Sequence, residues 1–292
     1  MRKSKEVRDL EKLVKQQSNV ITRLRKVRAK SLAAALGRRD SRTRKLTVYC
    51  TDSHGAYQDE QAVSTFLGDL KTLDPGAVVH GGDALDCGGF LSSHGTLGVV
   101  AEMAISYEDD VMATNTLFDA IQSNVRKRTE FTYVEGNHEN RIRRWVATQV
   151  LSNARDAQFV ESLIGVETVL SVNKRNIRFI RRDMCYDGFD VSGTFKIGEK
   201  LACQHGEAFA GKTAVFRQLD RLGHSIVFGH SHRLVTAYGE KLTGQLVAIN
   251  GGCLCQRRPV YGLTKTTDWV HGYVVCVTGP GGFFAFTVPI VN

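Results

Sequence analysis

The sequence predicts a layered α/β fold that follows a separate basic arm. Strand-like and helix-like segments alternate from residue 46 to about residue 151, and strand-like runs then succeed one another from about residue 166. This order favours layered α/β packing over a purely parallel sheet. Residues 1–45 hold 16 Lys and Arg against 4 Asp and Glu, whereas the other 247 residues hold 23 against 26. We therefore predict a helical arm and linker over residues 1–45 and a folded body over residues 46–292.

The arm is expected to form a helix. Apolar residues recur three and four positions apart, as along a coiled-coil seam, although Gln17 and Ser31 weaken this seam. Gly37 ends the predicted helix, and the following residues form the linker. Three interpretations are open: the helix packs on the body, forms a homo-oligomer, or binds nucleic acid through its positive charge. The seam positions are Leu10, Leu13, Gln17, Val20, Leu24, Val27, Ser31 and Ala34.

Strands and helices are predicted to alternate in the first half of the body. Leu46 to Cys50 (LTVYC) is typical of a buried strand, and the runs AVVH and FTYV follow it with the same character. The predicted strands are residues 46–50, 77–80 and 131–134. The predicted helices are residues 59–73, one or two helices within 99–125, and residues 139–151.

Strands dominate the second half, and one predicted helix near Lys212 to Leu222 interrupts them. The β-branched and aromatic residues of these segments favour strands. The strand-like runs are IRFIRRD (177–183), FKIGEKLACQHG (195–206), HSIVFGH (224–230), QLVAINGG (245–252), GYVVCVTG (272–279) and FFAFTVPIV (283–291).

The composition is that of an ordinary globular protein. Hydrophobic residues make up 42% and charged residues 24%, which is typical of this class. No apolar run approaches the roughly 20 residues of a membrane helix, so we expect no membrane contact. The basic N-terminus also lacks the apolar core of a secretory signal. Seven cysteines without a framework spacing predict free thiols in a reducing, cytoplasmic setting.

Five strand-like runs end in side chains that can bind a metal ion. Carboxylate, amide or imidazole groups follow each run, and nearby glycines let the backbone turn sharply. Because strand carboxyl ends converge in open α/β sheets, we expect these groups to share one crevice. The segments are residues 51–55 (TDSHG), 81–86 (GGDALD), 136–139 (GNHE), 205–207 (HGE) and 229–232 (GHSH).

This ordered set resembles the signature of the calcineurin-like metallophosphoesterase superfamily. The signature is D-x-H, G-D-x-x-D, G-N-H-[DE], an isolated His and G-H-x-H, and every block occurs here in that order. The resemblance covers residue 46 to about residue 252, and it does not extend to the arm or the last 40 residues. It implies a four-layer α/β/β/α sandwich of two packed mixed sheets, which agrees with the element order. The arm would add an extra N-terminal helix.

The resemblance also implies two metal ions that share a carboxylate. A pair of ions needs one common anionic ligand, and a hydroxide between the ions would be the nucleophile. Imidazole-rich ligands suit Mn, Fe, Zn or Co better than Mg or Ca, and we expect Mn. The ligands of one ion would be Asp52, His54, Asp83 and His232, and those of the other would be Asp83, Asn137, His205 and His230.

His138 is the residue that the resemblance assigns to proton transfer. It would face the phosphate as general acid and protonate the leaving oxygen, while Asp86 holds and polarises its imidazole. Arg141 is the expected phosphate clamp, and Asn137 and His138 would also contact substrate. Glu139 is expected in the first turn of the next helix, where the helix dipole favours a carboxylate.

Three functions follow from these predictions. We expect phosphodiester hydrolysis, with DNA as the substrate and the basic arm as its electrostatic contact. A phosphatase or phosphodiesterase for nucleotides or cyclic nucleotides, with an oligomerising arm, is the alternative. A metal-binding scaffold without activity is the third, but every expected ligand is present. Cys87 stands where serine/threonine protein phosphatases carry an Arg after G-D-x-x-D, which argues against that branch.

Overall fold

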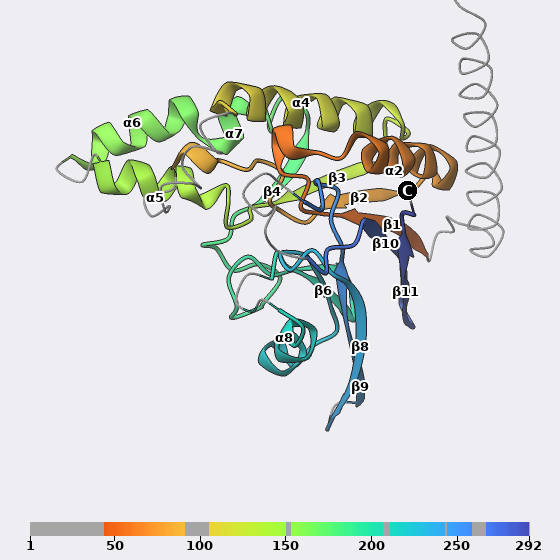
Figure 1. Cartoon of the computed structure of the whole chain (residues 1–292). Coiled ribbons are helices and arrows are strands. Elements are labelled where there is room, and N and C mark those ends of the chain that lie inside the picture. Colours follow the sequence, from red (N-terminus) through yellow and green to blue (C-terminus); the bar gives the residue numbers. More distant parts are fainter. Residues whose placement is uncertain are drawn as a thin grey trace, which may run out of the picture.

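Two mixed β-sheets pack face to face in this protein, with helices on their outer faces (Figure 1). The computed structural model describes residues 44–90, 105–149, 153–206, 209, 211–242, 244–258 and 267–291. The α/β class and the two packed mixed sheets are therefore confirmed. The predicted arm helix lies outside the described residues, so the extra helix and the division at residue 45 stay predictions.

The first sheet has six strands. β1 to β4 run parallel in chain order, and β10 and β11 add antiparallel strands beside β1. The parallel order places the carboxyl ends of β1 to β4 along one edge. In spatial order the strands are β11 (Gly282–Pro289), β10 (Gly272–Gly279), β1 (Lys45–Cys50), β2 (Ala77–His80), β3 (Glu130–Val134) and β4 (Ile177–Ile180).

The second sheet has five strands. β6, β7 and β9 are parallel, while β5 and β8 form antiparallel edges. The sequence did not predict β8, which pairs with β9 over eight residues. In spatial order the strands are β5 (Phe195–Gly198), β6 (Leu201–Cys203), β7 (Ile226–Phe228), β9 (Gly244–Gly251) and β8 (Leu234–Lys241).

Alternating side chains divide the core into layers. Successive strand residues point to opposite faces of a sheet. Val48 and Val78 therefore join the helix-facing core, whereas Tyr49 and Val79 face the second sheet. The layer between the sheets includes Tyr49, Val79, Val134 and Ile180 from the first sheet and Cys203, Val227 and Ile249 from the second.

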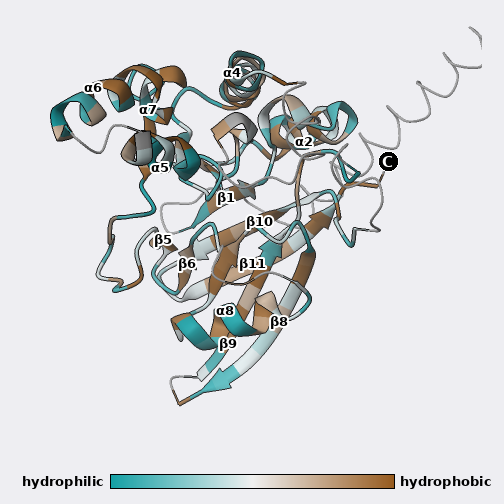
Figure 2. Cartoon of the chain, turned by 60° about the vertical axis from the view of Figure 1, so that its left-hand side comes forward, coloured by the Kyte–Doolittle hydropathy of each residue, from teal (hydrophilic) through white to brown (hydrophobic). Residues whose placement is uncertain are grey.

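Helices cover both outer faces, as the four-layer order requires. α2 (Glu60–Leu73) and α4 (Tyr107–Ser123) cover the first sheet through Phe66 and Phe118. α8 (Ala214–Leu222) covers the second sheet through Val215 and Leu219. Figure 2 shows hydrophilic and hydrophobic sides on α8, and apolar residues concentrated on the strands.

The remaining elements lie around this sandwich. They are α5 (Asn140–Gln149), α6 (Ala154–Ile164), α7 (Val166–Val169) and the short 3-10 helices η1 (Gly55–Tyr57) and η2 (Gly88–Phe90). The sequence predicted α5 but neither α6 nor α7. Of the predicted helical segment 99–125, residues 99–104 lie outside the description. No helix among the described residues is long and apolar enough to cross a bilayer.

Candidate metal centre

The predicted ligands lie on loops that follow strands of both sheets. β1, β2 and β3 of one sheet, and β6 and β7 of the other, each precede one of the five polar segments. Main-chain hydrogen bonds tie these loops together: Asp52 donates to Gly82 O at 3.0 Å, and Gly229 donates to His205 O at 2.8 Å. Segments far apart in the sequence therefore share one site, as expected for converging strand ends.

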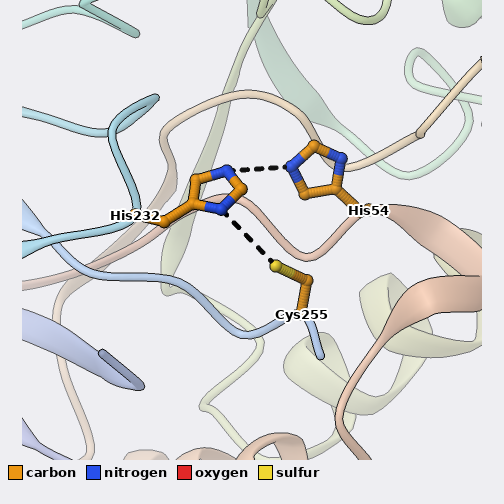
Figure 3. A group of neighbouring side chains, drawn as sticks. All are labelled: His54, His232 and Cys255. Atoms are coloured by element: carbon orange, nitrogen blue, oxygen red, sulfur yellow. Dashed lines mark hydrogen bonds between the residues drawn. The ribbon is translucent and has the colours of Figure 1, made fainter. Parts of the chain in front are cut away.

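Asp52, His54 and His232 form one half of the cluster. Oδ1 of Asp52 lies 3.1 Å from Nε2 of His232 and 4.0 Å from Nε2 of His54. The two Nε2 atoms are 3.1 Å apart, and Figure 3 shows the rings directing them toward each other. Two imidazole nitrogens and a carboxylate oxygen thus approach one point.

Asp83, Asn137, His205 and His230 form the other half. Nε2 of His205 lies 3.2 Å from Oδ2 of Asp83 and 3.0 Å from Oδ1 of Asn137. The donor atoms of Asp83, His205 and His230 lie within 4.8 Å of one another, and those of Asp52, His54 and Asp83 do so as well. Asp83 therefore belongs to both halves, which is the place predicted for the shared carboxylate.

Burial and mutual charge set the protonation of these groups. Burial would raise the pKa of Asp52, but the imidazoles of His232 and His205 outweigh it and lower this pKa to about 2. Burial would lower the pKa of His205, but Asp83 and Asp52 raise it to about 9. Without a metal ion, protonated imidazole therefore balances buried carboxylate, and metal binding would displace that proton.

The donor set fits divalent transition metal ions. Oδ1 of Asp52 is buried, and it faces Nε2 of His232 at 3.1 Å and Nε2 of His54 at 4.0 Å rather than a main-chain donor. A buried carboxylate oxygen in this state is costly unless another group compensates its charge. A cation among Asp52, His54 and His232 would do so, and mixed imidazole and carboxylate ligands suit Mn, Fe, Co or Zn.

Backbone strain accompanies the ligand positions. Asp52, His54, Asp83, His230 and His232 all have positive φ, between 49° and 67°. Such a conformation costs on the order of 1–3 kcal/mol for a non-glycine residue and persists only where the surroundings enforce it. The surrounding structure therefore holds these loops in an unfavourable backbone conformation that points the predicted ligands toward the cluster.

Two glycines allow the loops to approach the carboxylates. A Cβ atom at Gly136 would lie 2.1 Å from Oδ1 of Asp83, and one at Gly229 would lie 2.5 Å from Oδ2 of Asp52. Any larger residue at either position would displace a predicted ligand.

His138 lies beside the cluster, with Asp86 behind it. Nδ1 of His138 is 2.8 Å from the main-chain oxygen of Asp86 and 3.1 Å from its Oδ1. Nδ1 therefore carries a proton, and Nε2 faces Oδ2 of Asp83 at 3.7 Å. Oδ1 of Asp86 also lies 2.9 Å from Nδ1 of His54. Burial would raise the pKa of Asp86, but hydrogen bonds from both imidazoles hold it well below its usual range.

Arg141 lies where the predicted clamp should be. Its NH1 donates to the main-chain oxygen of Asp86 at 2.8 Å, and its NH2 lies 2.9 Å from Nε2 of His138. The guanidinium therefore sits next to the predicted general acid. The structure brings every predicted site residue into this cluster, while their roles toward metal and substrate stay predictions.

Glu139 has a different role from the predicted one. α5 begins only at Asn140, and the Glu139 side chain is buried. Its carboxylate anchors the loop that carries Asp83, whose amide lies 3.1 Å away. The other donors are the amides of Ala84 (2.6 Å), Leu85 (3.0 Å) and Gly136 (2.9 Å) and the hydroxyl of Tyr133 (2.6 Å).

Asp110 on α4 anchors the same loop and was missed by sequence reasoning. Its Oδ2 accepts from the amides of Asp86 at 2.8 Å and Cys87 at 2.7 Å. Asp110, Thr114 and Leu117 are spaced along the buried face of α4. A carboxylate on a buried helical face needs polar partners, and that pattern could have marked it.

Cys255 and Trp269 flank His232 and were also missed. Sγ of Cys255 lies 3.8 Å from Nδ1 of His232, on the side of the ring away from His54 (Figure 3). The Trp269 ring packs edge-on against His232, with centroids 4.0 Å apart. Burial raises the pKa of Cys255 well above its usual value, so a neutral thiol faces the imidazole.

Comparisons with known proteins add matches to solved structures only. No family model matches the chain, and no curated protein matches it. Vps29 from Cryptosporidium parvum is 13% identical, with 86% of this chain and 100% of that chain covered and a TM-score of 0.35. Zn-complexed Vps29 from Entamoeba histolytica is 12% identical, with 84% and 98% covered and a TM-score of 0.37. A predicted phosphoesterase from Streptococcus pneumoniae is 12% identical, with 85% and 100% covered and a TM-score of 0.31.

These values are low, and nothing about the activity of this chain follows from them. The resemblance of the sequence blocks to the calcineurin-like signature is independent of these matches. The five blocks stand in the order of the calcineurin-like signature, on an α/β sandwich of two mixed sheets. This is the fold that the resemblance implies, with the signature residues gathered at one site.

Proposed function

We propose that this chain is a two-metal-dependent phosphoesterase that hydrolyses phosphodiester bonds. The observation that carries the proposal is the meeting of seven metal-binding side chains from five loops, beside an imidazole–carboxylate pair. Buried titratable groups with strongly perturbed pKa values are typical of functional sites when they gather in this way.

The metal ligands would be those that the resemblance implies. Asp52, His54 and His232 would hold one ion, and Asn137, His205 and His230 the other, with Asp83 shared. When bound, the ions would supply charge stabilisation at the phosphate and a nucleophile at neutral pH. Mn is the proposed metal, with Fe, Zn and Co as alternatives.

His138 would hold the proton that the leaving oxygen requires. Its Nδ1 is fixed by Asp86, so Nε2 faces the centre, and the Asp86 carboxylate stabilises the protonated imidazole. Arg141 would exchange its contact with Nε2 for a phosphate oxygen when substrate binds. His138 would thus protonate the leaving oxygen, and Arg141 would bind the negative charge of the phosphate.

DNA is the substrate that we propose, because the net positive charge of the chain is confined to the arm. Residues 1–45 carry a net charge of +12, while the rest of the chain carries −3. A basic segment of this kind would attract a polyanion without reading its sequence. If the arm instead joins copies of the chain, nucleotides or cyclic nucleotides become the expected substrates.

A hydrolysis screen with the full chain tests the proposal. Bis-p-nitrophenyl phosphate and p-nitrophenyl phosphate would be compared first, followed by DNA, RNA, nucleotides and cyclic nucleotides, each with and without Mn²⁺. We expect metal-dependent turnover of the diester and of DNA. Strong turnover of mononucleotides with none on DNA would favour the alternative. Absence of metal-dependent hydrolysis on every ester would contradict the proposal as a whole.

A further inference from the structure

A second cationic site adjoins the metal centre at the end of β4. β4 is parallel to β3, and Ile180 pairs with Val134, so the two strands end at the same edge. Arg182 follows two residues after β4, and its amide donates to Oε2 of Glu135 at 3.0 Å. An arginine thus follows β4, whereas predicted metal ligands or the predicted general acid follow β1, β2 and β3.

A small cavity lies between this arginine and His205, one of the predicted metal ligands. It has a volume of about 80 Å³ and is lined by Arg182, Ser192, Gln204, His205, Gly206 and Arg221, among others. His205 also contacts Asp83 and Asn137 through Nε2. One wall of the cavity is thus a predicted metal ligand. Ligand pockets for whole small molecules measure about 300–1,000 Å³, so this cavity suits only a single small group.

The charge of the cavity favours an anion. Arg182 is half-buried, and Arg221, in the last turn of α8, adds a second guanidinium. Glu135 also lines the cavity, and its Oε1 lies 3.2 Å from Nη2 of Arg143, which pairs with Glu161 and Asp183 as well. Two guanidinium groups against one carboxylate leave the lining with net positive charge. Guanidinium groups bind phosphate oxygens through paired, charge-assisted hydrogen bonds, which a lysine cannot reproduce.

We propose that this cavity binds a second phosphate group of the substrate, next to the phosphate that is cleaved. This inference rests on the proposed phosphoesterase function and assigns Arg182 the main part in binding that group. The second phosphate could belong to the neighbouring link of a nucleic acid strand or to the terminal phosphate of a nucleotide. Both sources present the same chemistry to Arg182, and matched ligand pairs separate them.

Binding constants test the proposal without relying on turnover. Calorimetry would compare thymidine 3′,5′-bisphosphate with thymidine 5′-monophosphate, as strand-like ligands, and adenosine diphosphate with adenosine monophosphate, as nucleotides. The measurements use Mn²⁺-loaded protein in the wild-type and His138→Ala backgrounds. We expect the second phosphate to tighten binding about tenfold in one pair, the scale of one charge-assisted contact. Arg182→Gln should reduce that ratio to about one, and Arg182→Lys should restore part of it.

Arg178→Gln is the matched control, because it removes the same charge from a residue within β4, four positions before Arg182. Arg178 pairs with Asp187 at 3.9 Å, and its side chain is half exposed outside the cavity. The Arg178→Gln variant should leave the tenfold ratio of binding constants unchanged. If both variants reduced the binding ratio equally, or if Arg182→Gln left it unchanged, the assignment of Arg182 would be overturned. Hydrolysis of thymidine 5′-(p-nitrophenyl phosphate) with and without a 3′-phosphate separates this failure from failure of the proposed function, in which neither ester is cleaved.

Discussion

At the scale of single residues, Asp83 and His138 are in contact, but we expect them to have different roles in metal binding and proton transfer. Oδ1 of Asp83 accepts a hydrogen bond from the His138 amide at 2.9 Å, while Oδ2 faces His205 at 3.2 Å. Asp83 is the residue shared by both halves of the cluster. His138 turns its Nδ1 away from the cluster, toward Asp86. We therefore expect removal of Asp83 to affect metal binding and removal of His138 to affect proton transfer.

Paired alanine variants test this division. His138→Ala should keep its metal content and lose about 10²- to 10⁴-fold in kcat, which is the usual contribution of a general acid. Asp83→Ala should lose metal from both positions, because no other ligand is shared. Mass spectrometry of bound metal, together with kcat on bis-p-nitrophenyl phosphate, measures both effects. Equal metal loss in the two variants would show that His138 has been assigned wrongly.

Sequence reasoning found the residues that follow strands but not those that support them. Asp52, His54 and Asp83 were predictable because each stands within four residues of the end of a buried run, in a segment that contains glycine. The buried face of α4 could have marked Asp110, but no local pattern reveals that its partners are the amides of Asp86 and Cys87. For Glu139, the sequence indicated only a position near the start of a helix, so its hydrogen bonds to the Asp83 loop could not be predicted.

At the scale of elements, helices and strands with a clear apolar pattern were predicted, whereas those without one were missed. β1, β2 and β3 are short buried runs, and the prediction located them to within a residue. β8 contains Gly239 and has only one buried residue, so it lacks the alternation of a half-buried strand. α6 buries none of its residues, although Asn153 caps its first turn through Arg155 and Asp156. Exposed elements of this kind carry little sequence signal.

The buried Glu139 carboxylate holds residues 83–85 after β2, and its removal should be costly. Glu139→Gln replaces an acceptor oxygen by an NH₂ group among donors from residues 83–85, residue 136 and Tyr133. Unsatisfied buried groups cost about 1–3 kcal/mol, and for a domain of this size each kcal/mol lowers Tm by about 2–4 °C. We therefore expect a fall in Tm of roughly 2–12 °C, with weaker Mn²⁺ binding.

Glu130→Gln provides the control for that substitution. Glu130 forms an ion pair with Lys45 at 2.6 Å, but its side chain is 69% exposed, so little stability should be lost. Calorimetric scans of the metal-free variants, followed by Mn²⁺ titration, measure both quantities. A similar Tm for Glu139→Gln and the wild type would mean that Glu139 does not anchor the loop.

At the scale of the whole molecule, the site exists only because two sheets meet. Asp52 and Asp83 come from the first sheet, whereas His205 and His232 follow strands of the second. The core between the sheets holds these loops in register through residues such as Tyr49 and Val227. The sequence could predict the strands but not that β10, from near the C-terminus, pairs with β1. That pairing spans more than 200 residues, and no local pattern specifies it.

The N-terminal segment differs in charge from the rest of the chain. Residues 1–37 contain eleven Lys and Arg and three Asp and Glu, while the body is close to neutral. Deletion of these residues should weaken DNA binding and flatten its salt dependence, because each phosphate contact contributes about −0.9 to the slope of log K against log salt. Turnover of bis-p-nitrophenyl phosphate should persist, since the metal centre lies wholly within the body. Fluorescence anisotropy at several salt concentrations measures the slope. An unchanged slope, with a smaller assembly in sedimentation, would identify the arm as an oligomerisation helix instead.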